Sequence, residues 1–187
     1  MFTLQHLWEM MNSSTPLENV LEAIVNSTQG ELGYMHCVII SKCEDENGEY
    51  LQILAQSNDG LIERLNNIIG SPGIQTRRLA YDNGSVFADT MRQRKIIQTK
   101  SIGQSLKAVL PELSPEIVTK IISNQPVKSV IVVPLITQTK EFGWFCVFSA
   151  REELAGTEMD FLGLFAKQIE LAITIADLIQ AVRDQAV

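Results

Sequence analysis

Two apolar runs in the C-terminal half of the chain decide its fold. The first is Val127-Lys128-Ser129-Val130-Ile131-Val132-Val133-Pro134-Leu135-Ile136, and the second is Phe142-Gly143-Trp144-Phe145-Cys146-Val147-Phe148-Ser149. Both are rich in β-branched or aromatic residues and are separated by a short polar loop, a pattern typical of a β-hairpin. Because neighbouring positions within each run are apolar, we expect this hairpin to lie at the centre of a sheet that is covered on both faces.

The residues before this hairpin predict a mixture of helices and strands. A first helix is expected from Thr15, as its N-cap, with Pro16 at the first helical position, to about Gln29, ended by Gly30. Strands over 34–40 and 50–56 flank the turn at Asn47-Gly48 and should form a second hairpin. Further expected elements are helices over 59–69, 86–94 and 114–122 and short strands near 75–80 and 96–97. This mixture indicates the α+β class.

The two ends of the chain both predict helices. Residues 1–14 carry Leu4, Leu7 and Trp8 at helical spacing, which indicates a short amphipathic helix before the main domain over 15–180. The last helix is expected over 158–187, with Thr157 as its N-cap. No stop signal follows it, so we expect the natural helix to continue beyond this chain, toward an effector domain.

Composition narrows the class of protein. The chain has 187 residues, of which 45% are hydrophobic and 20% charged, as in an ordinary folded domain with a single core. Its net charge of −7 disfavours nucleic acid and anionic membranes as partners. The sequence shows neither a signal peptide nor a long uncharged apolar run, so we expect a cytoplasmic protein.

Cysteines and histidines are few and scattered. The three cysteines, Cys37, Cys43 and Cys146, are widely spaced, and we expect them to be reduced thiols. With only His6 and His36 in the chain, neither a structural zinc site nor a Ser-His-Asp or Cys-His catalytic unit is readily assembled. No catalytic or metal-binding residue is therefore predicted.

Four segments in order give the chain a family resemblance. They are the two apolar runs quoted above, the upstream segment Asp82-Asn83-Gly84-Ser85-Val86-Phe87-Ala88-Asp89-Thr90-Met91-Arg92-Gln93-Arg94-Lys95, and the helical segment Phe161-Leu162-Gly163-Leu164-Phe165-Ala166-Lys167-Gln168-Ile169-Glu170-Leu171-Ala172-Ile173. Over residues 16–180 this order resembles the GAF domain. The resemblance implies an antiparallel sheet of about five or six strands, with the terminal helices on one face and short helices and loops over a ligand pocket on the other.

The resemblance also implies a location for the ligand. Strand alternation separates Val130, Val132 and Pro134 from Ile131, Val133 and Leu135. By similarity to bilin-binding GAF domains, the first set faces the pocket. The same similarity places Trp144, Cys146 and Phe148 beside the pocket, and Val118 and Ile121 on the helix above it. These apolar positions fit either a cavity for a small or flat hydrophobic ligand or a filled second core without ligand, and both interpretations stay open.

Cofactor and enzyme interpretations find less support in the sequence. Bilin-carrying relatives usually have a cysteine followed by a histidine on the helix over the pocket, and residues 115–123 contain neither. His36 and Cys37 are weak candidates as haem or iron–sulfur ligands, since neighbours in a strand point to opposite faces. Free methionine sulfoxide reductases resemble this chain in length, but their cysteines lie in the stretch corresponding to residues 73–126, where this chain has none. A cyclic nucleotide stays open, with Arg77 or Arg78 as the phosphate contact.

The last helix predicts a dimer. Its apolar residues form two stripes, of which one can pack on the sheet while the other needs a further partner. The second stripe comprises Leu164, Leu171, Ile175, Leu178 and Val182, and with Leu4, Leu7 and Trp8 it is the expected homodimer interface. Alternatively, the N-terminal helix covers this stripe within one chain.

The expected function follows from the resemblance and from the last helix. We expect a regulatory rather than enzymatic module of a bacterial signal-transduction protein such as a sensor histidine kinase. It would bind a small or hydrophobic ligand and relay its state through dimeric terminal helices. A ligand-free domain that only dimerises or docks a partner is the alternative, and a methionine sulfoxide reductase-type enzyme is a third.

Overall fold

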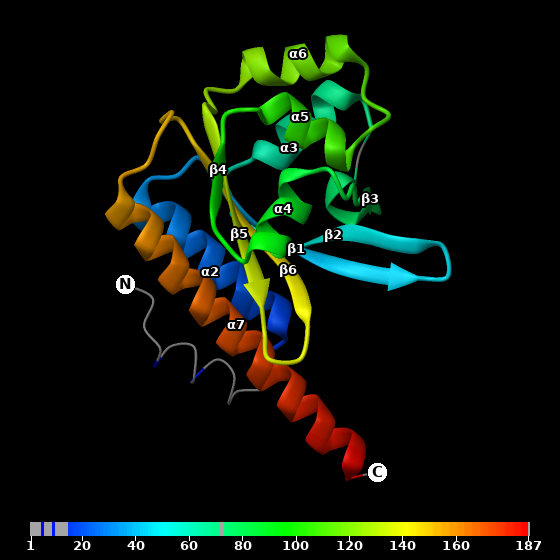
Figure 1. The fold of residues 1–187 in the computed structure, drawn as a ribbon, viewed down its shortest axis with the longest axis vertical. Coiled ribbons are helices and arrows are strands. Elements are labelled where there is room, and N and C mark those ends of the chain that lie inside the picture. Colours follow the sequence, from blue (N-terminus) through cyan, green and yellow to red (C-terminus); the bar gives the residue numbers. More distant parts are fainter. Residues whose placement is uncertain (1–4, 6–8, 10–14, 72, 187) are drawn as a thin grey trace.

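The architecture is a six-stranded antiparallel sheet with helices on both faces. The computed structural model describes residues 15–71 and 73–186, together with residues 5 and 9. The strands lie in the order β3-β2-β1-β6-β5-β4, and every neighbouring pair is antiparallel. Helices α2 and α7 lie side by side on one face of the sheet, and α3 to α6 lie on the other (Figure 1). This arrangement confirms the predicted α+β fold.

The strands and helices have the following bounds. The strands are β1 (His36–Asp45), β2 (Gly48–Gln56), β3 (Leu79–Ala80), β4 (Ile97–Thr99), β5 (Ser129–Ile136) and β6 (Glu141–Ser149). The helices are α2 (Leu17–Leu32), α3 (Leu61–Ile69), α4 (Val86–Gln93), α5 (Ile102–Val109), α6 (Pro115–Asn124) and α7 (Gly156–Gln185), with one 3₁₀ turn, η1 (Ile74–Thr76).

Strand alternation divides the interior into two cores. In β5, Val130 and Val132 belong to the core beneath α3–α6, whereas Ile131 and Val133 belong to the core beneath α2 and α7. The residues of β6 alternate in the same way. Both faces of the central strands are therefore buried, which explains why these strands read as nearly continuous apolar runs.

Two features hold the sheet and its covering helix in register. Gly143 has φ +156°, and a Cβ at this position would lie 2.0 Å from the carbonyl oxygen of Ile40 on β1. Trp144, the next residue, is fully buried, and its indole N–H donates to the carbonyl oxygen of Phe87 and to Oγ1 of Thr90, both at 2.9 Å. Since Phe87 and Thr90 lie on α4, this tryptophan fixes α4 on the sheet.

Several predicted boundaries were wrong. Helix α2 begins after Pro16, not with Thr15 as the N-cap, and continues through Gly30 to Leu32 because Gly33 is the residue that adopts the left-handed conformation at its end. The strand expected over 75–80 is the 3₁₀ turn η1 followed by the two-residue strand β3. Helix α5 had not been predicted.

The start of the last helix was also misplaced. Helix α7 begins at Gly156 with Ala155 as its N-cap, so Thr157 lies inside the first turn. Oε2 of Glu158 accepts the backbone N–H of Ala155 at 3.1 Å, and the same carboxylate pairs with Arg151. An acidic side chain at the start of a helix suits the partial positive charge of its N-terminus.

Helix α7 buries one side along the sheet and exposes the other. The buried apolar residues are Leu162, Ala166, Ile169, Ala172 and Ile173. Exposed large apolar side chains are Phe161, Leu164, Leu171, Leu178, Ile179 and Val182, with exposed fractions from 37% to 66%. Phe161 and Ile179 thus lie on the exposed side of α7 together with residues of the second stripe. The predicted N-terminal helix, with Leu4, Leu7 and Trp8, lies outside the described residues.

Candidate functional site

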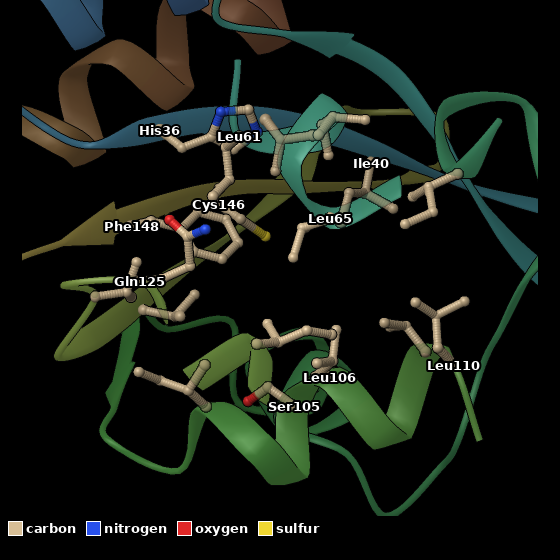
Figure 2. A pocket seen from close by; sticks show the side chains of 18 of the residues that line it. His36, Ile40, Leu61, Leu65, Ser105, Leu106, Leu110, Gln125, Cys146 and Phe148 are labelled. Atoms are coloured by element: carbon tan, nitrogen blue, oxygen red, sulfur yellow. The ribbon is translucent and has the colours of Figure 1, made fainter. Parts of the chain in front are cut away.

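An apolar cavity lies between the sheet and helices α3, α5 and α6. Its volume is about 130 Å³. Ile40 and Cys146 line it from the sheet, Leu65 from α3, Leu106 from α5, and Leu110 from the end of α5 (Figure 2). A cavity of this kind is comparable to apolar protein cavities that take up a molecule the size of benzene.

The predicted ligand-binding residues divide into two groups. Ile121, Val130, Cys146 and Phe148 line the cavity. Val118, Val132 and Trp144 belong to the same core but lie outside the lining of the cavity. Trp144 is instead engaged with α4. Strand alternation predicted on which face of the sheet these residues lie. It could not predict at which positions along that face the packing leaves a cavity.

His36 at the start of β1 is the cavity residue with the most elaborate polar surroundings. Its side chain is 1% exposed, and its Nδ1 lies 2.8 Å from Oδ2 and 3.0 Å from Oδ1 of Asp59. The imidazole also contacts the ring of Phe148 edge-on, with 5.5 Å between the ring centroids. These contacts hold the imidazole at one end of the cavity, beside Leu61 (Figure 2).

Asp59 gathers several hydrogen-bond donors besides His36. Oγ of Ser57 donates to its Oδ2 at 2.5 Å, and the backbone N–H of Leu61 donates to its Oδ1 at 2.9 Å. Burial alone would raise the pKa of Asp59, but the hydrogen bonds from His36, Ser57 and Leu61 outweigh it and leave the pKa below its ordinary value. Asp59 is therefore a carboxylate at neutral pH.

Cys37 and Cys146 lie on opposite sides of the sheet. Cys146 lines the cavity, whereas Cys37 belongs to the core beneath α2 and α7. Burial raises the pKa of both thiols well above the ordinary value. His36 and Cys37 point to opposite faces, as predicted for neighbours in a strand. Both thiols therefore stay protonated, and Cys146 gives the cavity a small, weakly polar surface.

Sites for charged ligands are not found around the cavity. Arg77 pairs with Glu112 and Arg78 with Asp45, both near the surface. Within the described part of the chain, His, Cys, Asp and Glu side chains form no group of three that could hold a metal ion. Helix α6, above the cavity, contains neither cysteine nor histidine.

Sequence reasoning missed the pairing of His36 with Asp59. His36 had been considered only as a weak candidate for a haem or iron–sulfur ligand, and Asp59 only as the start of a helix. The two residues are 23 positions apart, and they meet because β1 and β2 are paired and Asp59 follows the end of β2. Asp59-Gly60 before an apolar helix was a visible turn signal, but nothing in the sequence linked it to His36.

The fold agrees with a comparison of the sequence with protein families. The model of the GAF domain matches residues 16–173. The chain belongs to the GAF domain family. In this GAF domain the cavity lies on the face of the sheet opposite α2 and α7.

Solved structures of other GAF-like domains share this fold. The domain of a two-component sensor histidine kinase protein from Sinorhizobium meliloti is 20% identical, with a TM-score of 0.58 over 90% of this chain and 97% of that one. Residues 122 to 287 of a methyl-accepting chemotaxis protein are 19% identical, with a TM-score of 0.60 over 93% and 97%. A phycoerythrobilin-bound GAF domain from a cyanobacterial phytochrome is 16% identical, with a TM-score of 0.62 over 95% of each chain.

One further comparison and an inspection of the helices gave negative results. A search of curated proteins found none that matches this GAF domain significantly. Among the described helices, none combines the length and the apolar character that crossing a membrane requires.

Proposed function

We propose that this GAF domain is the sensory module of a signal-transduction protein, in which a small hydrophobic ligand in the cavity alters the arrangement of paired terminal helices. The apolar cavity between the sheet and α3, α5 and α6 carries the proposal. Cys146 and Val130 line the cavity from the central strands, and their neighbours Val147 and Ile131 pack beneath α2 and α7. A ligand that binds one arrangement of α3, α5 and α6 more tightly would raise the population of that arrangement. The terminal helices, which pack on the other face of the same strands, would shift with it.

Binding of a small apolar probe tests the cavity. We expect toluene, added to the full chain, to shift the NMR signals of Leu106 and Val130 and to raise the melting temperature. Leu106→Phe fills the cavity and should abolish these effects, while Lys107→Phe adds the same ring on the exposed side of α5 and should leave them intact. A protein unaffected by toluene would be better described as a ligand-free dimerisation or docking domain.

The exposed face of α7 supports the dimeric part of the proposal. The positions 161, 164, 168, 171, 175, 178 and 182 recur at intervals of three and four, which is the pattern of a coiled-coil seam. Leu164 is 59% exposed and Leu178 is 61% exposed in the single chain. Each such side chain contributes about 1.5–3 kcal/mol when it is fully buried. Two copies of α7 packed along this seam would bury several of them.

Gln168 occupies the middle of the same seam. Its side-chain oxygen is buried and has no hydrogen-bond partner among the described residues. If the side chain turns outward in a parallel pair of helices, the two copies of Gln168 can bond to each other, and a single polar core position of this kind fixes the register at some cost in stability. We therefore expect Gln168→Leu to tighten the dimer.

Sedimentation at micromolar concentration tests the dimer. We expect the full chain to sediment as a dimer and Leu171→Glu combined with Leu178→Glu to sediment as a monomer. Gln180→Glu changes an exposed residue outside the seam and should leave the dimer intact. A wild-type chain that stays monomeric would show that the seam is covered within one chain, as the N-terminal segment could do, and would remove dimerisation from the proposal.

The regulatory rather than enzymatic character of the domain is part of the same proposal. An effector such as a histidine kinase, joined to α7 in a longer protein, would receive the signal. A thiol-dependent reductase would need a reactive cysteine at the ligand cavity, whereas Cys146, which lines the cavity, and Cys37 are buried and protonated. The more accessible Cys43 lies outside the cavity lining. We expect no reduction of free methionine sulfoxide in the presence of dithiothreitol, and measurable turnover would contradict a purely regulatory role.

A further inference from the structure

Nε2, the second ring nitrogen of His36, is a polar atom of the cavity region that makes no hydrogen bond with any described residue. Nδ1 of His36 faces Asp59, whereas Nε2 is buried and has no hydrogen-bond partner among the described residues. The same imidazole lines the cavity. Buried polar groups in folded proteins are nearly always satisfied, and each exception calls for an explanation.

The contacts of Asp59 determine which nitrogen of His36 carries a proton. Asp59 is a carboxylate and can only accept hydrogen bonds. It already accepts from Ser57 and from the backbone of Leu61. The short contact with His36 therefore requires a proton on Nδ1, and no described residue lies in place to accept one from Nε2. The neutral imidazole with a lone pair on Nε2 satisfies both conditions.

We propose that Nε2 of His36 accepts a hydrogen bond from the cavity ligand, which is a small, uncharged, largely apolar molecule carrying one hydroxyl or N–H donor. This proposal rests on the proposed sensory function and adds the recognition chemistry of the ligand. The lining of the cavity contains no Asp, Glu, Lys or Arg, so a charged ligand would lose its hydration without gaining an opposite charge. The volume of about 130 Å³ suits a single six-membered ring with one hydroxyl group.

The surroundings of His36 hold its lone pair in a fixed direction. The Asp59 carboxylate holds one side of the ring, and Phe148 packs edge-on against it. Oγ of Ser57 in turn donates to Asp59 and accepts the backbone N–H of Cys37 at 2.8 Å. Because Nε2 itself is buried, the apolar side chains beside it have to move aside for a donor to reach it, while the imidazole keeps its direction.

Phenol and toluene make a matched pair of probes. Phenol has a donor hydroxyl where toluene has a methyl group, and the two rings are of equal size. We expect phenol, but not toluene, to shift the Nε2 signal of His36 in a long-range ¹H–¹⁵N spectrum of the full wild-type chain, with the ring proton on Nδ1 before and after binding. A spectrum with the proton on Nε2, or an Nε2 signal that phenol leaves unchanged, would overturn the proposal.

Variants measure the same preference in solution. In His36→Leu the ratio of the toluene and phenol dissociation constants should fall by about three- to tenfold relative to wild type, the contribution of one hydrogen bond. Using a ratio removes the different hydration of the two probes. Thr28→Val, which removes a buried hydroxyl on the opposite face of the sheet, should leave the ratio unchanged. Equal ratios in wild type and His36→Leu would contradict the proposal.

The outcomes separate this proposal from the function on which it rests. If neither phenol nor toluene binds, the cavity is not a ligand site, and the sensory function fails together with the inference. If both probes bind but His36 does not discriminate between them, the sensory function stands and only the recognition by Nε2 is wrong. Should His36→Leu fail to fold, the wild-type ¹⁵N spectrum decides alone.

Discussion

Glu170 on α7 accepts the backbone N–H of Ile136, the last residue of β5, with 3.0 Å between Oε1 and N. The side chain of Glu170 is 11% exposed, and its other carboxylate oxygen contacts Nζ of Lys167 at 2.6 Å. A charged acceptor thus satisfies a backbone group where the strand ends. Because apolar packing alone tolerates sliding, this hydrogen bond fixes the position of α7 along the sheet.

Removing this acceptor should weaken the whole domain. Glu170→Ala leaves the N–H of Ile136 without its partner, and we expect the free energy of unfolding to fall by about 1.5–3 kcal/mol. Urea unfolding followed by circular dichroism measures the change. Lys167→Ala is the matched control, since Lys167 is 73% exposed and its loss should cost less than about 1 kcal/mol. Equal losses in the two variants would contradict a structural role of the Ile136 contact.

A side chain at Gly143 should be poorly tolerated. In Gly143→Ala the new Cβ would overlap the carbonyl oxygen of Ile40, so β1 and β6 would have to separate at their pairing. We expect a loss of about 3 kcal/mol or a failure to fold. Gly30→Ala is the contrasting variant, because Gly30 lies inside α2 with open space around its Cβ position. It should gain up to about 1 kcal/mol, and thermal unfolding compares the two.

Asp59 should make the domain sensitive to acid. Since the pKa of Asp59 is lower in the folded protein than its ordinary value of 3.8, the unfolded chain binds the proton more readily. The stabilising contribution is therefore fully present above that value and is lost as the pH falls through the lower folded pKa. We expect the difference in urea midpoint between wild type and Asp59→Asn to narrow as the pH falls from about 6 to about 3. A difference independent of pH would rule out this contribution.

The three thiols should differ in reactivity. The thiolate is the reactive form, and burial raises the pKa of Cys37 and Cys146 and also blocks access to them. Cys43 lies half-buried near the end of β1. In the native protein an aromatic disulfide reagent should label Cys43 at least about tenfold faster than the other two. Cys43→Ser should remove the fast phase, and all three thiols should react equally in denaturant.

The sequence allowed the central part of the fold to be predicted because burial there follows a simple period. The strands β5 and β6 are apolar on both faces, and alternation correctly divided Val130 and Val132 from Ile131 and Val133. Helix ends were harder. Both Gly30 and Gly33 could have ended α2, and only the packing of the last turn decides which one adopts the left-handed conformation.

The elements around the cavity were less predictable for a physical reason. Helix α5 has no fully buried residue, its N-cap Ser101 makes no side-chain cap, and its first turn contains Gly103, a weak helix former. Its apolar residues face a cavity rather than a filled core, so the local pattern resembles that of an irregular segment. The pairing of His36 with Asp59 likewise depends on tertiary structure, since neither residue stands in a motif that points to the other.

The alternation of β6 has a consequence for the divergence of such domains. Cys146 faces the cavity, while its chain neighbours Phe145 and Val147 face α7 and α2. The cavity lining can therefore change through substitutions at every second position, without altering the residues on which α2 and α7 pack. An engineer could exchange the cavity lining of one such domain for that of another and keep the surface on which α2 and α7 pack. Natural substitutions at these positions can alter the cavity lining in the same way.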